Sequence, residues 1–306
     1  MKTASLQGVL APVVTPFTAD LRPDSARLVR QCRWLVDQDV GLAVFGTNSE
    51  GNSLSLREKR DLLDALVDAD LPAARMMPGT GTCALPDTVE LTRHAVARGC
   101  AGVLMLPPFY YSDVTDDGLF ASYAEVIERV GDRALRIYLY HIPQVSGVPI
   151  RLALIERLLA RYPGTVAGIK DSSGDFANTK AMLERFQPQG FDVYCGSESL
   201  LLATLRDGGA GCISATANVN PRAIARLARE WRSAEADAQQ AALGVVRQVF
   251  AQYPMIAALK EAVARFAHDD AWRTLRPPLL PLAPEQRASL RASLDALAFD
   301  MPGLAE

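Results

Sequence analysis

The chain has 306 residues, of which 49% are hydrophobic and 22% are charged, and its formal net charge is −3. This balance describes a globular protein with ample core-forming material, and the length suits an α/β barrel, which often exceeds about 250 residues as one domain. The small negative charge and the scattered basic residues exclude the electrostatic pattern of a protein that binds nucleic acid or an anionic membrane.

Five dispersed cysteines and three histidines predict neither a disulfide framework nor a metal site. The N-terminal apolar run is interrupted by Pro12, and no later run approaches the about 18 apolar residues of a membrane span. We therefore expect a cytoplasmic protein without a metal ion and without a membrane or nucleic-acid partner.

Short apolar runs recur along the chain, and amphipathic helical patterns lie between most of them. Several runs are almost continuously apolar, as parallel strands buried on both faces are. Eight strands alternating with helices predict a (β/α)8 TIM barrel; a doubly wound sheet would have fewer strands and a glycine-rich turn after the first. The expected strands are 9–14, 42–45, 75–78, 102–106, 136–140, 166–170, 191–195 and 211–214.

Helix-start signals support this alternation. Ser55 and Glu58 have the spacing of a capping box, and Asp24 and Thr115 precede helical patterns as N-cap residues do. From Ala223 through Leu297 the pattern is mainly helical, with a proline-rich break at 277–284. The prediction is a barrel over residues 1–220 that carries the active site, and a helical region over residues 221–306 packed on it.

Lys170 is the first candidate for chemistry, because it closes the apolar run 166–170. An unpaired ammonium at the end of a buried strand costs several kcal/mol, so the position requires either a path to water or a function. A neutral amine there can attack a carbonyl and form a Schiff base. The segment alone leaves both interpretations open.

Other strand ends add polar groups, as the catalytic face of a barrel would. The loop 46–51 offers Thr47 and Asn48 as donors for an anion, and Tyr110 lies in a proline-stiffened turn. Tyr140 ends the fifth expected strand, where a phenol could relay protons. His141, on the opposite face of that strand, is expected to have a structural role.

In order, the segments GTNSEG, PPFYY, YHIP, GIKDSSGD and GAGCISATANVNP resemble the dihydrodipicolinate synthase/N-acetylneuraminate lyase family of class I aldolases. The resemblance runs from Val9 to about Pro221, with a helical tail as in that family. It implies a barrel, usually a homotetramer arranged as a dimer of dimers. It also implies a lysine that condenses with the ketone of a 2-oxo acid and needs no cofactor.

The resemblance assigns a role to each matching residue. Lys170 corresponds to the Schiff-base lysine, and Tyr140 to the tyrosine that moves protons. Thr47 corresponds to the hydroxyl that links this tyrosine to a second one, Tyr110, which in the family reaches into a neighbouring subunit's site. Thr47 and Asn48 cover the loop that holds the substrate carboxylate. Ile213 corresponds to the residue whose backbone borders the bound pyruvyl group.

Departures from the family pattern concern the substrate. Asn48 and Ser49 replace two residues of the usual Gly-Ser/Thr-Thr-Gly-Glu loop, and Val145 stands where dihydrodipicolinate synthases have a carboxylate-binding arginine. Neuraminate lyases have two consecutive acids where this chain has Glu198 between two serines. These changes favour a polyol shorter than a nine-carbon sugar, bound in part by Glu198.

The predicted function is therefore a Schiff-base lyase acting on a 2-keto-3-deoxy sugar acid, by dehydration or by retro-aldol cleavage to pyruvate and an aldehyde. The altered loop and the single acid fit neither standard lyase pocket, which favours dehydration. The alternatives are an enzyme like N-acetylneuraminate lyase or dihydrodipicolinate synthase, and a catalytically silent sugar-acid-binding protein. The presence of both Lys170 and Tyr140 argues against the silent protein, and the few histidines argue against a metal-dependent aldolase.

Overall fold

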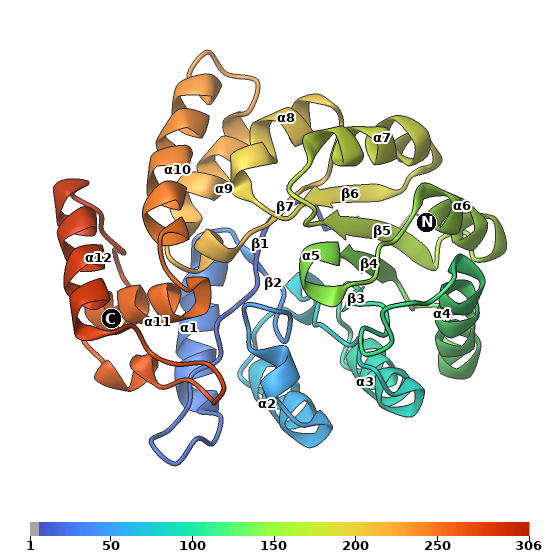
Figure 1. Ribbon diagram of the computed structural model, residues 1–306, viewed down its shortest axis with the longest axis horizontal. Helices are drawn as coiled ribbons and strands as arrows, with labels where there is room; N and C mark the ends of the chain where they lie inside the picture. Colours follow the sequence, from blue (N-terminus) through green and yellow to red (C-terminus); the bar gives the residue numbers. More distant parts are fainter. Residues whose placement is uncertain (1–5, 306) are drawn as a thin grey trace. The chain divides into compact units, whose positions relative to one another are not determined.

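Parallel strands alternate with helices along most of the chain in the computed structural model, which describes residues 6–305 (Figure 1). The strands are β1 (Gly8–Ala11), β2 (Gly41–Leu42), β3 (Val103–Met105), β4 (Ile137–His141), β5 (Val166–Asp171), β6 (Asp192–Cys195) and β7 (Gly211–Ile213). The helices before β7 are α1 (Ser25–Asp37), α2 (Leu56–Asp68), α3 (Leu85–Ala97), α4 (Asp116–Val130), α5 (Pro143–Ser146), α6 (Leu152–Arg161), α7 (Phe176–Phe186) and α8 (Leu201–Arg206). Those after it are α9 (Pro221–Glu230), α10 (Ala236–Ala251), α11 (Met255–Phe266) and α12 (Pro284–Ala296).

The chain divides into two compact units. The first unit comprises the described residues before Val9 together with Pro72–Ile213, and the second comprises Val9–Leu71 together with the described residues from Ser214 onward. The predicted division at residue 220 stays a prediction.

The first unit is built on a parallel sheet in which β3, β4, β5, β6 and β7 lie side by side in chain order. The helices that connect these strands cover one side of the sheet (Figure 1). Every residue of β4 is buried, as are all residues of β5 except Ala167. Burial on both faces explains why these strands are continuously apolar in the sequence.

One expected strand, 75–78, is an irregular extended segment instead. A 3-10 turn occupies Ala73–Arg75, and the pairing with β3 is a single bridge between Gly79 and Leu104. The Met76 and Pro78 carbonyls still accept hydrogen bonds from Ala101 and Leu104. Pro78 has no N–H to donate, which prevents a continuous ladder at this point.

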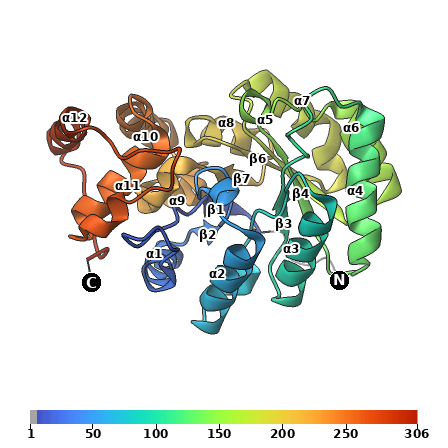
Figure 2. The same ribbon diagram turned by 60° about the horizontal axis from the view of Figure 1, so that its bottom comes forward.

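In the second unit β1 pairs with β2, and most of the structure is helical. The expected helix starts are confirmed: Asp24 and Thr115 are N-caps, of α1 in this unit and α4 in the first, and Ser55 and Glu58 form the capping box of α2. The expected proline-rich break directly precedes α12, which packs with α10 and α11 (Figure 2).

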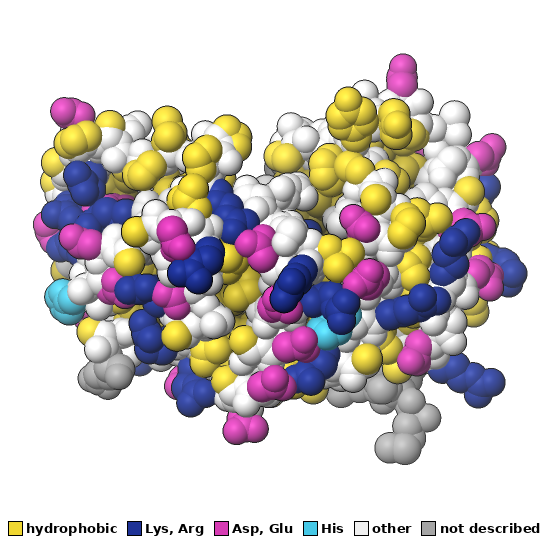
Figure 3. Space-filling model, turned by 90° about the horizontal axis from the view of Figure 1, so that it is seen from below, with side chains coloured by type: hydrophobic (Ala, Val, Ile, Leu, Met, Phe, Trp, Pro, Cys, Tyr) yellow, Lys and Arg dark blue, Asp and Glu magenta, His cyan; other side chains and the backbone are white. Residues whose placement is uncertain are grey.

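Helix α11 is buried almost all round, since Ala257 through Ala264 are all buried. Among the helices of residues 6–305, none by itself is long and apolar enough to cross a membrane; α10 and α11 pass that test only as a pair bent by 105°. On the face shown in Figure 3, basic and acidic side chains are interspersed and no patch of one sign stands out.

Candidate active site

Lys170 lies next to Tyr140 in the sheet of the first unit. The two residues are paired in register on β5 and β4, and Lys170 is paired in register with Tyr194 on β6. Both site side chains are buried, with 3% of Lys170 and 2% of Tyr140 exposed. The Lys170 Nζ lies 4.2 Å from the centre of the Tyr140 ring. The Lys170 amine is therefore held against the face of the Tyr140 ring in a buried place.

The strands hold this pair on a packed layer of other side chains. One level below, Tyr138, Gly168 and Asp192 are in register, and the Tyr138 hydroxyl donates to Asp192 Oδ2 at 3.1 Å. A Cβ at Gly168 would lie 2.4 Å from the Asp192 carbonyl oxygen and 2.7 Å from the Tyr138 ring, so only glycine fits. The Tyr138 ring also contacts that of Tyr194 edge-on, at 5.8 Å. This layer is therefore closely packed one register level below Tyr140 and Lys170.

On the opposite face, His141 and Asp171 accept hydrogen bonds from neighbouring segments. The Ile150 N–H donates to His141 Nδ1 at 3.0 Å, and burial lowers the pKa of His141, although the Asp171 carboxylate opposes this. Asp171 accepts hydrogen bonds from the Ser173 N–H at 2.9 Å and from the Thr179 hydroxyl at 2.7 Å. These bonds tie the start of α7 to the end of β5, and so fix the backbone beside Lys170.

Glu198 and Ile213 are buried in the same unit. Glu198, in the 3-10 turn Glu198–Leu200 after β6, is 1% exposed, and Ile213, at the end of β7, is 0% exposed. A hydrogen bond with the Cys195 thiol, together with burial, holds the pKa of Cys212 well above its usual range; the Glu198 charge adds to this and the Lys170 charge opposes it. Glu198 and Lys170 thus both act electrostatically on Cys212, at the strand ends β5 to β7.

Tyr110 and Val145 are placed differently from this buried group. Tyr110 is 78% exposed, and its ring contacts that of Tyr111 edge-on with 5.3 Å between centres. Val145, in the short helix α5, is 64% exposed. Both side chains are therefore available to molecules outside the chain.

Thr47 and Asn48 belong to the second unit, on the loop of residues 46–53 that follows β2. The loop is tight: the Ser49 and Gly51 N–H groups donate to the Gly46 carbonyl, and the Glu50 N–H donates to that of Thr47. A Cβ at Gly51 would lie 2.0 Å from the Phe45 carbonyl oxygen, which requires glycine here. Thr47 and Asn48 are half-buried at the tip of this loop.

An ion pair that the sequence patterns did not predict connects the 46–53 loop to α11. The Lys260 side chain, from α11, donates to Glu50 Oε1, and neither side chain has any exposed surface. Burial lowers the pKa of Lys260 to about 8, although Glu50 opposes the shift. The sequence does contain a sign of a buried charged group, because Lys260 and Glu261 interrupt the apolar run from Met255 to Val263 in α11.

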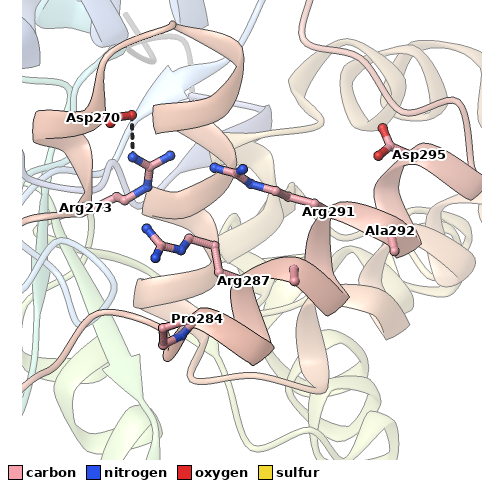
Figure 4. Close-up of a pocket in the computed structure, with 8 residues that line it drawn as sticks. Asp270, Arg273, Pro284, Arg287, Arg291, Ala292 and Asp295 are labelled. Carbon is pink, nitrogen blue, oxygen red and sulfur yellow. Dashed lines mark ion pairs between the residues drawn. The ribbon is translucent and has the colours of Figure 1, made fainter.

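A groove lined by charged residues lies among the C-terminal helices of the second unit (Figure 4). Arg273 and Arg291 line it, and both are bonded to the buried Glu261, at 2.6 Å and 3.0 Å. Arg273 also pairs with Asp270. Because the acids balance these two arginines, we interpret the cluster as an ion-pair network that joins α11, α12 and the 3-10 turn Asp270–Arg273.

Within residues 6–305, no three His, Cys, Asp or Glu side chains gather as a metal site would require.

Comparison with known proteins identifies relatives along almost the whole chain. The sequence model of the dihydrodipicolinate synthetase family matches residues 5–297. A protein of Chloroflexus aurantiacus described as an uncharacterized DapA-like lyase is 35% identical over 298 residues, covering 96% of this chain and 98% of that protein.

Solved structures of proteins from this family superpose on the chain. Dihydrodipicolinate synthase from Agrobacterium tumefaciens superposes with a TM-score of 0.87 at 29% identity, covering 95% of this chain and 99% of that one. YagE, a prophage protein of the same family from Escherichia coli K12 solved in complex with pyruvate, has a TM-score of 0.87 at 28% identity, covering 97% and 100%. These likenesses confirm the predicted (β/α)8 TIM-barrel class with additional C-terminal helices. The chain therefore belongs to the dihydrodipicolinate synthetase family and is a class I lyase.

Proposed function

We propose that Lys170 forms a Schiff base with the C2 ketone of a 2-oxo acid, and that the natural substrate is a 2-keto-3-deoxy sugar acid. One observation supports the Schiff-base role of Lys170. The buried Lys170 Nζ lies 4.2 Å from the Tyr140 ring centre, at the ends of two neighbouring strands. A lysine placed to snorkel would extend to water, whereas this side chain is 3% exposed and packs against a phenol.

The chemistry begins with the neutral amine. Its lone pair attacks C2 of the substrate, and the carbinolamine then loses water to give an iminium ion. The iminium accepts the electron pair of the C3–C4 bond as that bond breaks, and an aldehyde leaves. Protonation at C3 and hydrolysis release pyruvate and regenerate the amine. In the dehydration route the same iminium acidifies C3, which loses its proton as the neighbouring hydroxyl departs.

Tyr140 is proposed to carry protons to and from the oxygen atoms in these steps, because its ring is in contact with the amine. Thr47 is proposed to link Tyr140 to Tyr110, and Thr47 and Asn48 to hold the substrate carboxylate, as the family resemblance implies. The backbone of Ile213 is proposed to border the pyruvyl group. The exposure of Tyr110 supports its proposed place in a neighbouring subunit's site, within a homotetramer.

The proposed substrate class rests on residues that differ from the family pattern. Val145 offers no charge to a second carboxylate, which disfavours dihydrodipicolinate synthesis. Glu198 is a single buried acid with serines beside it, a set suited to hydroxyl groups. YagE, 28% identical over 303 residues, is named as a candidate 2-dehydro-3-deoxy-D-gluconate aldolase, which favours cleavage; the predicted preference for dehydration stays a prediction.

Borohydride trapping tests the imine. Wild-type protein incubated with pyruvate and then reduced should gain the mass of one reduced pyruvyl group per chain, and Lys170→Ala should gain none. Lys180→Ala is the matched control, since Lys180 is half-exposed on α7 and should leave labelling intact. Absence of an adduct on the wild type would refute the mechanism.

The substrate is tested with a panel of 2-keto-3-deoxy pentonates and hexonates. Release of pyruvate identifies cleavage, and dehydration is identified by a 2-oxo semialdehyde from a pentonate or by a 2,5-dioxo acid from a hexonate. Turnover of aspartate semialdehyde with pyruvate, in the absence of turnover on the panel, would contradict the proposed substrate class.

A further inference from the structure

Glu50 has a backbone conformation that its own side chain disfavours. Its φ is 54°, in the left-handed region where L-residues with a Cβ are rare, and Phe45 at the other end of the loop has a φ of 64°. Two such residues flank the turn that carries Thr47 and Asn48. The surrounding structure must therefore determine this conformation, because local preference opposes it.

The contacts of the Glu50 carboxylate hold the backbone in this conformation. Oε1 accepts from Lys260 Nζ, and Oε2 accepts from the backbone N–H of Arg276 at 3.3 Å. Lys260 is itself oriented, since it donates to the Thr274 carbonyl at 2.8 Å and lies 4.6 Å from the centre of the Phe17 ring. The carboxylate is thus anchored between two points of the segment from α11 to Arg276.

The far end of the loop is held by the same segment. Arg276 Nη1 donates to the Ser53 carbonyl at 2.6 Å and to Glu58 Oε2, in the first turn of α2, at 2.9 Å. On the opposite side, the Thr15 hydroxyl donates to the Ser49 carbonyl at 2.6 Å. The loop is therefore fixed at positions 49, 50 and 53, immediately after Thr47 and Asn48.

We infer that Lys260 is a positioning residue for the 46–53 loop: by holding the buried Glu50 carboxylate, it fixes the backbone that presents Thr47 and Asn48 to the substrate carboxylate. The inference rests on the proposed function, which gives those two residues their role. A buried ion pair often stabilises no better than two apolar side chains of similar volume, so we attribute to this pair an orienting function rather than a stabilising one.

The experiment compares pyruvate half-saturation among variants, measured as the extent of borohydride trapping against pyruvate concentration. Lys260→Met should raise the half-saturating concentration by about tenfold to a hundredfold, because a loop displaced by about 1 Å presents its donors wrongly. Trapping at saturating pyruvate should reach the wild-type extent, since Lys170 is unchanged. Arg265→Met is the matched control: Arg265 lies on the same helix and pairs with Asp295, and should shift half-saturation less than about twofold.

The double variant Glu50→Gln/Lys260→Met separates positioning from stability. It removes the unpaired buried charge, so its melting temperature should recover toward the wild-type value while half-saturation stays raised. Recovery of both quantities together would overturn the inference, as would a Lys260→Met variant that saturates like Arg265→Met. If Lys260→Met does not fold, Glu50→Gln gives the same comparison with the side-chain volume kept. A wild type that forms no adduct at all would instead refute the proposed function.

Discussion

At the scale of single residues, the site depends on which side chains two neighbouring strands place in register. Lys170 and Tyr140 come into contact because both lie on the same face of adjacent parallel strands. One residue further on, His141 and Asp171 lie on the other face and accept hydrogen bonds from backbone N–H groups. A change of strand register by one residue would exchange these two sets, so the contact between Lys170 and Tyr140 depends on the register.

Replacement of Tyr140 tests its role in proton transfer. Tyr140→Phe should slow imine formation by about 10²- to 10⁴-fold, because general acid–base catalysis contributes that much, while the final extent of labelling is kept. The measurement is a time course of borohydride trapping with pyruvate. Tyr138→Phe is the control, since Tyr138 lies on the same strand and face but donates to Asp192. Equal rates for the two variants would contradict the assignment.

Much of this residue-scale description could be predicted from the sequence. A lysine that closes the apolar run 166–170 and a tyrosine that ends the preceding strand are visible as patterns. The partner of Glu50 could not be predicted, because Lys260 is 210 residues away and sequence spacing carries no information about that contact. The exposed position of Tyr110 does not follow from its residue type, since tyrosine occurs both in cores and on surfaces; only the family resemblance pointed to it.

At the scale of elements, helix starts were predictable and the third strand was not. Side chains that cap a helix act within three residues, so Ser55 and Glu58 carry the signal locally. A strand requires a partner, and the segment around Pro78 has an apolar pattern without the donors for a full ladder. Alternation of strands and helices therefore predicted the fold class despite one irregular member.

Helix α2 provides a pH-dependent test. The hydrogen bond from Arg276, helped by the Ser55 backbone and hydroxyl and opposed by burial, lowers the pKa of Glu58 from 4.5 to about 2. A carboxylate with a lowered folded-state pKa stabilises the protein above its unfolded-state pKa, and this contribution disappears as the pH falls through the folded-state value. The melting-temperature difference between wild type and Glu58→Gln should therefore be largest near neutral pH and shrink between pH 4.5 and about 2.

Glu125→Gln on α4 is the comparison for that experiment. Glu125 pairs with Arg129 at 2.8 Å, but both side chains are more than half exposed. Exposed ion pairs contribute little, so this variant should match the wild type across the same pH range. A constant difference for Glu58→Gln at every pH would show that its effect is steric.

At the scale of the whole molecule, the proposed homotetramer gives the exposed aromatic pair Tyr110 and Tyr111 a role in contacting another copy of this chain. Both rings are more than 70% exposed, which is unusual for large aromatic side chains. Under the proposed assembly, Tyr110 leaves its own chain to complete a neighbour's site. Each site would then depend on the oligomer as well as on the fold.

Light scattering tests the assembly. We expect a particle of four times the 33.1 kDa chain mass, and Tyr110→Ala should shift it toward smaller species and lower the rate of imine formation. Leu280→Ala, which also removes an exposed apolar side chain, should change neither. A wild type that is monomeric at assay concentration and fully active would disprove the shared site.

The 210-residue separation of Glu50 and Lys260 has a consequence for biosynthesis. A ribosome adds about 5–20 residues per second, so about 10–40 s pass between the synthesis of the two residues. During that interval the Glu50 carboxylate has no buried partner and stays hydrated. The loop that carries Thr47 and Asn48 is translated early but reaches its final shape only after α11 has been made. Under the inference above, the site should bind pyruvate only after Lys260 has been made and has paired with Glu50.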